Sequence, residues 1–328
     1  MKKYLVEYIR NRIGDDIMYL MLLSAAALLA VCFVLNKIYQ KHAGTTLKAG
    51  LAFNTLIGFF AAIIFFCIGG FKFKITVFSM VLATAMTVVV IAYTLLGFRI
   101  LKDGSVAVYS IFLMSGGMTV PYLYGLLFLD EEFIWHRTLG LLVLISAVAV
   151  SNFGVKGETV NVKRVLMCVC VFLLNGCVSV ISKVHQVEES FAKVGTEQFV
   201  MLGGIAKFLL GAIVLLFIVV LEKRHTDASK RVTDTADGEN SPRALLPRKD
   251  VLKVVIPIII IAAAVDGISY FLQLKGAENL PATVLYPTVT GASMIFSAIA
   301  DLVVFKQKPS RFVIISVALC FVGTLLFL

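Results

Sequence analysis

Charged residues are scarce in this sequence. Asp, Glu, Lys and Arg make up 15% of the 328 residues, whereas hydrophobic residues make up 59%. A soluble domain is usually about a quarter charged. The shortage of charge argues against an ordinary soluble domain, and a mean hydropathy of +0.95 indicates an integral membrane protein.

The common motifs of enzymes are also missing. The sequence has four histidines, which lie at the ends of apolar stretches or between them, and none forms an HExxH pair of zinc ligands. No GxSxG nucleophile elbow and no glycine-rich phosphate loop is present. We therefore expect no enzymatic activity.

Cysteine gives no sign of a metal or cofactor. All six cysteines fall inside apolar stretches, where cysteine behaves as a small apolar side chain. Cys168 and Cys170 are two residues apart on an expected helix, so their thiols point away from each other and do not converge on one ion. We expect neither a metal site nor a cofactor.

The excess of positive charge does not indicate a nucleic-acid partner. The formal net charge is +10, from 30 basic and 20 acidic residues. The basic residues lie between apolar stretches, where anionic lipid headgroups and the positive-inside bias account for them. The expected surroundings are a lipid bilayer, here taken as the cell membrane.

Apolar runs of about twenty residues are long enough to span a bilayer. Ten such runs predict an all-α, polytopic membrane protein, at residues 17–35, 47–68, 75–98, 105–129, 138–153, 165–181, 199–221, 251–274, 282–305 and 312–328. The polar segment 1–16 precedes a run too long for a cleaved signal peptide, so residues 17–35 are expected to form the first membrane helix.

One long polar segment interrupts the series, at residues 222–250. It contains seven basic and six acidic residues and few large apolar ones, a composition typical of a disordered or weakly ordered loop. A solvated spacer and a docking segment for a partner are both compatible with this composition.

An internal repeat divides the chain into residues 17–153 and 154–328. With an offset of 176 residues the third to fifth runs lie on the eighth to tenth, and with an offset of about 146–150 the first two lie on the sixth and seventh. Five helices per half place the halves in opposite orientations. Such inverted repeats are typical of secondary transporters, in which the site lies near the middle of the membrane.

Each half contains a helix, a short break and a second helix followed by charged or polar residues. In the first half the pattern runs through Ser105-Val106-Ala107 and Pro121 to Leu129-Asp130-Glu131-Glu132. In the second it runs through Lys275-Gly276-Ala277-Glu278-Asn279-Leu280-Pro281-Ala282 and Leu285-Tyr286-Pro287 to Phe305-Lys306-Gln307-Lys308. With the ten runs, these patterns resemble the EamA-like branch of the drug/metabolite transporter (DMT) superfamily.

The resemblance implies a carrier of a small organic solute such as a metabolite, an amino acid or a drug-like compound. It also implies a glutamate after the fourth and ninth helices. Glu131 matches the first position, whereas Gln307 stands at the second. The resemblance does not imply a particular substrate.

Asp266 and Lys207 are the first candidates for a functional site. Asp266 lies in the middle of the eighth run, where an unpaired charge is costly. Lys207 lies in the seventh run between Gly204 and Gly211, on a face of small residues. The two runs are antiparallel, and both residues lie about 21–22 Å from the same membrane face at ~1.5 Å per residue. We expect them to meet, either as a structural ion pair or as a pair that a coupling proton, cation or substrate separates.

Further polar side chains repeat at helical spacing and predict faces turned toward a cavity. Tyr270 and Gln273 share a face with Asp266, and the ninth run contains the stripe Tyr286, Thr290 and Ser293. The sixth run contains Asn175 and Ser179. Serine and threonine also link membrane helices by hydrogen bonds, so interhelical contacts are the alternative. Asp301 is expected near the interface, against Lys306.

Three questions stay open, on the functional class, the orientation in the membrane and the oligomeric state. A receptor or assembly subunit that docks through residues 222–250 is the alternative to a transporter. Basic residues are more numerous on the side of that segment, which places the termini outside, whereas the resemblance implies cytoplasmic termini, our working expectation. The sequence does not predict the oligomeric state.

Overall fold

The computed structural model describes residues 2–103, 106–151, 162–232, 249–306 and 310–327. Within these ranges the regular structure consists of ten α-helices without strands. They are α1 (Lys2–Ala43), α2 (Leu47–Ile68), α3 (Val77–Asp103), α4 (Val106–Phe128), α5 (Trp135–Ser151), α6 (Val162–Val187), α7 (Thr196–Val232), α8 (Lys249–Asn279), α9 (Ala282–Phe305) and α10 (Arg311–Leu325). Gln307 lies outside the described residues.

Eight of these helices are long and apolar enough to cross a membrane in the described part of the chain. The other two, α5 and α10, are apolar but shorter, with 17 and 15 residues. The protein is therefore a multi-pass integral membrane protein, as its composition predicts. The bounds of α2 and α9 coincide with the runs expected at 47–68 and 282–305.

Two helices extend more than ten residues beyond their expected runs. α1 begins at Lys2, so the polar segment is continuous with the first membrane helix, and α7 continues to Val232. The expectation of a disordered loop from residue 222 is therefore wrong for residues 222–232. No Gly or Pro occurs between Ala212 and Gly238, so no helix-breaking residue ends the helix where it leaves the apolar region. Residues 233–248 lie outside the described residues.

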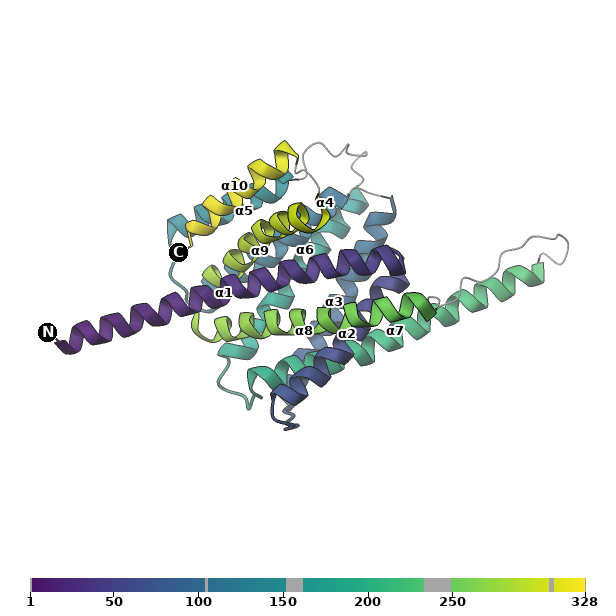
Figure 1. The fold of residues 1–328 in the computed structure, drawn as a ribbon, viewed down its shortest axis with the longest axis horizontal. Coiled ribbons are helices and arrows are strands. Elements are labelled where there is room, and N and C mark those ends of the chain that lie inside the picture. The colour runs from purple at the N-terminus through teal and green to yellow at the C-terminus, as the bar shows by residue number, and fades with distance from the viewer. Residues whose placement is uncertain (1, 104–105, 152–161, 233–248, 307–309, 328) are drawn as a thin grey trace.

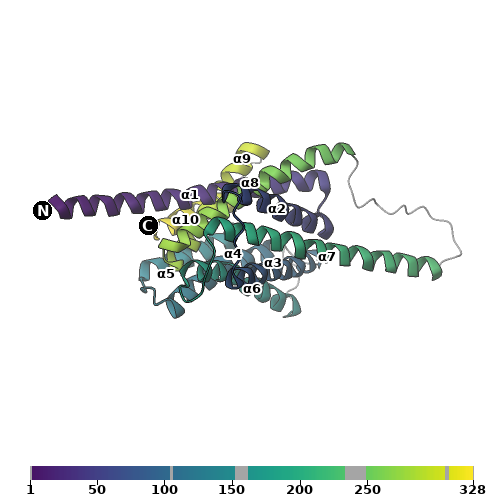
Figure 2. The same ribbon diagram turned by 90° about the horizontal axis from the view of Figure 1, so that it is seen from below.

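The helices place the ends of the chain at one face of the bundle. The N-terminus and the C-terminus lie at the same end of the molecule, and the C-terminal end of α7 extends from the opposite end (Figure 1). Figure 2 shows the same separation in the perpendicular view. We call these the terminal face and the loop face.

Close helix packing is concentrated where α2 meets α7. A Cβ atom on Gly58 would lie 2.8 Å from the carbonyl oxygen of Gly204, and a Cβ atom on Gly204 would lie 2.7 Å from the carbonyl oxygen of Gly58. Only glycine permits the two backbones to approach this closely. The other extensive pairs are α1 with α8 and α9, α6 with α3 and α4, α4 with α9, and α5 with α10.

Candidate solute cavity

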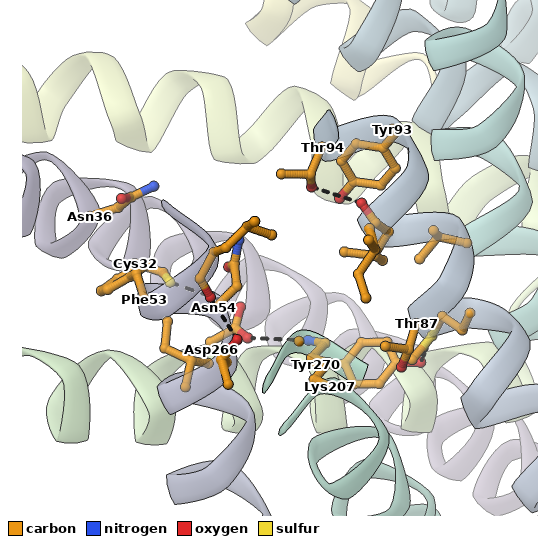
Figure 3. A pocket seen from close by; sticks show the side chains of 18 of the residues that line it. Cys32, Asn36, Phe53, Asn54, Thr87, Tyr93, Thr94, Lys207, Asp266 and Tyr270 are labelled. Atoms are coloured by element: carbon orange, nitrogen blue, oxygen red, sulfur yellow. Dashed lines mark hydrogen bonds and ion pairs between the residues drawn. The ribbon is translucent and has the colours of Figure 1, made fainter. Parts of the chain in front are cut away.

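A cavity of about 450 Å³ lies among six helices, α1, α2, α3, α6, α7 and α8. This volume is in the range that holds a small organic molecule. Figure 3 shows polar side chains from several of these helices around one space. The polar lining consists of Cys32, Asn36, Asn54, Thr55, Thr87, Tyr93, Thr94, Asn175, Lys207, Asp266, Tyr270 and Gln273.

Lys207 and Asp266 lie together in the wall of this cavity, so the expectation that they meet is confirmed. The Lys207 Nζ atom is 3.9 Å from Asp266 Oδ2, and each side chain is 30% exposed. A conventional hydrogen bond between such groups measures about 2.7–2.9 Å. The two charges attract each other without a close hydrogen bond, and both remain accessible from the cavity.

Glycines allow Lys207 to occupy this position. Gly211, one turn further along α7, packs so closely on Thr55 that an added Cβ would lie 2.3 Å from the Thr55 hydroxyl oxygen. An added Cβ on Gly58 would lie 2.7 Å from the Lys207 Cβ. The stem of Lys207 thus runs over the bare backbone of α2.

The carboxylate of Asp266 has few strong donors around it. Its other oxygen, Oδ1, faces the thiol of Cys32 on α1 at 3.8 Å, and a thiol is a weak donor. Dashed lines in Figure 3 mark this contact and the pair with Lys207. Asp266 is therefore held between α1 and α7 by two long contacts, which a bound molecule with a better donor can replace.

Three other predicted residues line the same cavity. The hydroxyl of Tyr270 lies 2.8 Å from that of Ser182 on α6, and Asn175 donates to the Leu113 carbonyl of α4 at 2.7 Å. Gln273 donates to the Ser269 hydroxyl at 3.3 Å. These contacts fix the three side chains in the cavity wall, where Tyr270 and Gln273 belong to the stripe of α8 and Asn175 to α6.

The stripe on α9 and Ser179 lie elsewhere and do not line this cavity. The Tyr286 hydroxyl donates to the Ser179 carbonyl at 2.7 Å, and Ser293 donates to the Thr290 carbonyl at 2.8 Å. Tyr286 is 6% exposed and Ser293 2%. In this conformation these residues form hydrogen bonds within or between helices, as expected under the alternative interpretation that such stripes link membrane helices.

Asp301 forms an ion pair with a different lysine from the one expected. Its Oδ1 atom pairs with Lys37 Nζ on α1 at 3.0 Å, whereas the sequence suggested Lys306. Lys306 has a left-handed backbone (φ 52°) at the C-cap of α9.

The contributions of α1 and α2 were not predicted. Asn36 and Asn54 line the cavity from these helices, together with Cys32 and Thr55. For Asn54 the available signal was an isolated amide within an otherwise apolar run, which is costly in lipid unless it faces protein or water, whereas Asn36 directly follows its run. A single such residue forms no stripe, so helical spacing alone does not select it.

The cavity lies between the middle of the bundle and the loop face. Its lining on α1, α2 and α3 spans Leu29–Asn36, Leu51–Ile57 and Met86–Thr94, which are the middle and loop-face portions of these helices. Beyond the cavity, toward the terminal face, the short turn between α8 and α9 is packed against α4 and α6. We call this turn, residues 277–283, the α8–α9 elbow.

Two charged side chains hold the elbow. Lys183 of α6 donates to the carbonyls of Ala277 and Leu280 at 2.9 and 2.7 Å. The carboxylate of Glu131, which follows α4, accepts from the backbone N–H groups of Ala282 and Thr283 at 2.6 and 2.9 Å. The Lys183 ammonium lies at the partially negative C-terminal end of α8, and the Glu131 carboxylate lies at the partially positive N-terminal end of α9, so each charge stabilises its helix end. The elbow is thereby anchored to α6 and to the segment that follows α4.

Comparison with known proteins agrees with this architecture. A family model described as the EamA-like transporter family matches residues 165–328. A solved structure, described as "Crystal structure of protein", has a TM-score of 0.66 at 14% identity, with 95% of this chain and 96% of that chain covered. At that identity the likeness shows the fold alone. No curated protein matches the sequence.

Proposed function

The chain belongs to the EamA-like transporter family of the DMT superfamily, and on this premise we propose that it moves a small organic solute across the cell membrane by alternating access of two inverted halves. The halves are residues 17–153 and 154–328. The observation that carries the proposal is a cavity of about 450 Å³ with the Lys207–Asp266 pair in its wall. A charged pair facing such a space is characteristic of a transport pathway.

The packing of the helices supports the two halves. If α1–α5 correspond to α6–α10, the contact of α1 with α8 corresponds to that of α6 with α3, and both occur. The contact of α1 with α9 corresponds to that of α6 with α4, and both occur as well. The pairs α2–α7, α4–α9 and α5–α10 correspond to themselves. This is the arrangement expected of an inverted repeat.

The chemistry of the wall favours a solute that carries both a positive and a negative group. A solute with one charge would pair with one of the two wall charges and leave the other without a partner, which is costly in a site of low dielectric. A zwitterion offers a carboxylate to Lys207 and an ammonium to Asp266. The amides of Asn36, Asn54 and Asn175 supply further hydrogen-bonding groups around the pair.

Flux through reconstituted protein tests the function. Purified protein in liposomes is mixed with radiolabelled solutes in four groups: zwitterions, anions, cations and neutral polar compounds. We expect uptake above empty liposomes for the zwitterions. Uptake confined to another group would contradict the proposed solute class but not transport. Chemical turnover without flux would indicate an enzyme, and the absence of both would favour a receptor or assembly subunit.

A further inference from the structure

The lysine that holds the α8–α9 elbow has a sequence equivalent in the other half. Lys183-Val184-His185-Gln186 near the end of α6 matches Lys37-Ile38-Tyr39-Gln40 near the end of α1, with an offset of 146 residues. The same offset relates the first two membrane helices to the sixth and seventh. Lys37 thus occupies at the loop face the position that Lys183 occupies at the terminal face.

Aromatic packing supports this equivalence in three dimensions. The ring of Tyr39 packs on Phe53 of α2 with centroids 4.4 Å apart, and the ring of His185 packs on Phe199 of α7 at 3.6 Å. Phe53 and Phe199 are also 146 residues apart. Both lysines therefore precede an aromatic residue fixed against the next helix of the same half.

The two lysines differ in what they bind. Lys183 is 5% exposed and donates to the carbonyls at the end of α8. The side chain of Lys37 is 40% exposed, pairs with Asp301 and lies 4.2 Å above the ring of Phe305. Lys183 is therefore buried against the end of α8, whereas its equivalent Lys37 is held by side chains of α9.

Helix packing shows the same asymmetry. α6 packs against α8, but among the described residues α1 and α3, which are their equivalents, have no packing of comparable extent. The cavity lies between α1 and α3, with Asn36 and Thr94 in its lining. The loop face is thus open at the place where the terminal face is closed.

We propose that Lys37 and Lys183 hold the two faces closed in turn, Lys37 the loop face and Lys183 the terminal face, and we call each lysine a latch. This inference rests on the proposed alternating access. When the terminal face opens, Lys183 leaves the α8–α9 elbow. Lys37 then leaves Asp301 and donates to the last carbonyls of α3, so that α1 closes on α3. Asp301 acts as a holding residue that keeps Lys37 away from α3 while the loop face is open.

Opposite effects of two variants test this inference. Thr94→Cys, in a chain whose six native cysteines are replaced by alanine, serves as the reporter in vesicles of known orientation. A membrane-impermeant maleimide is added from the loop face or from the terminal face, and the ratio of the two labelling rates is measured. Lys37→Gln should raise the loop-to-terminal ratio about threefold and Asp301→Asn should lower it about threefold, a size set by the exposure of the pair.

The latch on the closed face gives a third expectation. Lys183→Gln should lower the ratio by roughly tenfold, because it removes two charge-assisted hydrogen bonds from the closed terminal face. Lys41→Gln is the matched control for Lys37→Gln, since Lys41 lies on the same helix as Lys37 and 4.6 Å above the same Phe305 ring. It should leave the ratio unchanged. If Lys183→Gln unfolds on purification, the half-exposed Lys37 and Asp301 still decide the question.

A simple structural ion pair gives a different result. Loss of either partner would then shift the ratio in the same direction or not at all, and that outcome overturns the latches. Solute flux of the unmodified chain in liposomes separates this failure from a failure of transport. Flux together with same-direction shifts overturns the latches alone, whereas absence of flux and labelling from one face in every variant overturn alternating access as well.

Discussion

At the scale of single residues, the decisive feature is the pair of Lys207 and Asp266, whose opposite charges lie close together without a short hydrogen bond. Either charge alone within the membrane is costly, and the other compensates for it. At 3.9 Å the pair balances charge while leaving donors and acceptors for a third group. The same feature makes the pair suited to binding and poorly suited to rigid cross-linking of helices.

Asp266→Asn should abolish most of the transport without unfolding the protein. The amide has nearly the same shape but lacks the charge, so we expect uptake to fall more than about tenfold, which corresponds to a loss of ~1.4 kcal/mol or more in interaction energy. Initial rates in liposomes measure the effect. Asp130→Asn, an exposed change in the turn after α4, is the control and should keep full uptake. Retention of uptake by Asp266→Asn would contradict the role of the pair.

At the scale of helices, small residues decide which surfaces approach. An added Cβ on Gly116 of α4 would lie 2.1 Å from the backbone carbonyl oxygen of Phe172 on α6. A backbone atom cannot move aside as the end of a flexible side chain can. The contact of α4 with α6 therefore depends on glycine at this position.

Gly116→Ala should lower the free energy of unfolding by about 1–3 kcal/mol, the usual cost of overpacking. Gly203→Ala is the matched control, because its added Cβ would meet only the terminal methyl of Met86 at 3.5 Å. That change should be neutral or stabilising by up to ~1 kcal/mol, since alanine favours helix. Thermal unfolding in detergent measures both, and equal effects of the two substitutions would contradict the packing argument.

At the scale of the whole molecule, the short helices α5 and α10 determine the topology. They pack against each other and have 17 and 15 residues, which at ~1.5 Å per residue is somewhat less than a hydrocarbon core of ~30 Å. If both cross the membrane, the two termini share a face and the end of α7 lies on the other.

Protease and antibody access decide between these topologies. With epitope tags at both ends and a protease site inserted after Asp237, we expect the two tags to be accessible from one side and the inserted site from the other. A C-terminal tag accessible only from the side of the inserted site would mean that α10 does not cross. In sealed cells the same measurement determines which face is cytoplasmic, for which charge count and family resemblance disagree.

The sequence by itself determined the membrane class, the positions of most helices and the meeting of Lys207 with Asp266. Apolar run length, fixed rise per residue and antiparallel order are local properties, and they suffice for these conclusions. Only the tertiary structure decided which polar faces share a cavity, because Tyr286 and Asn175 have similar helical patterns but only Asn175 lines it. It also decided the partners of Lys37 and Lys183, since these partners lie on helices distant in the sequence.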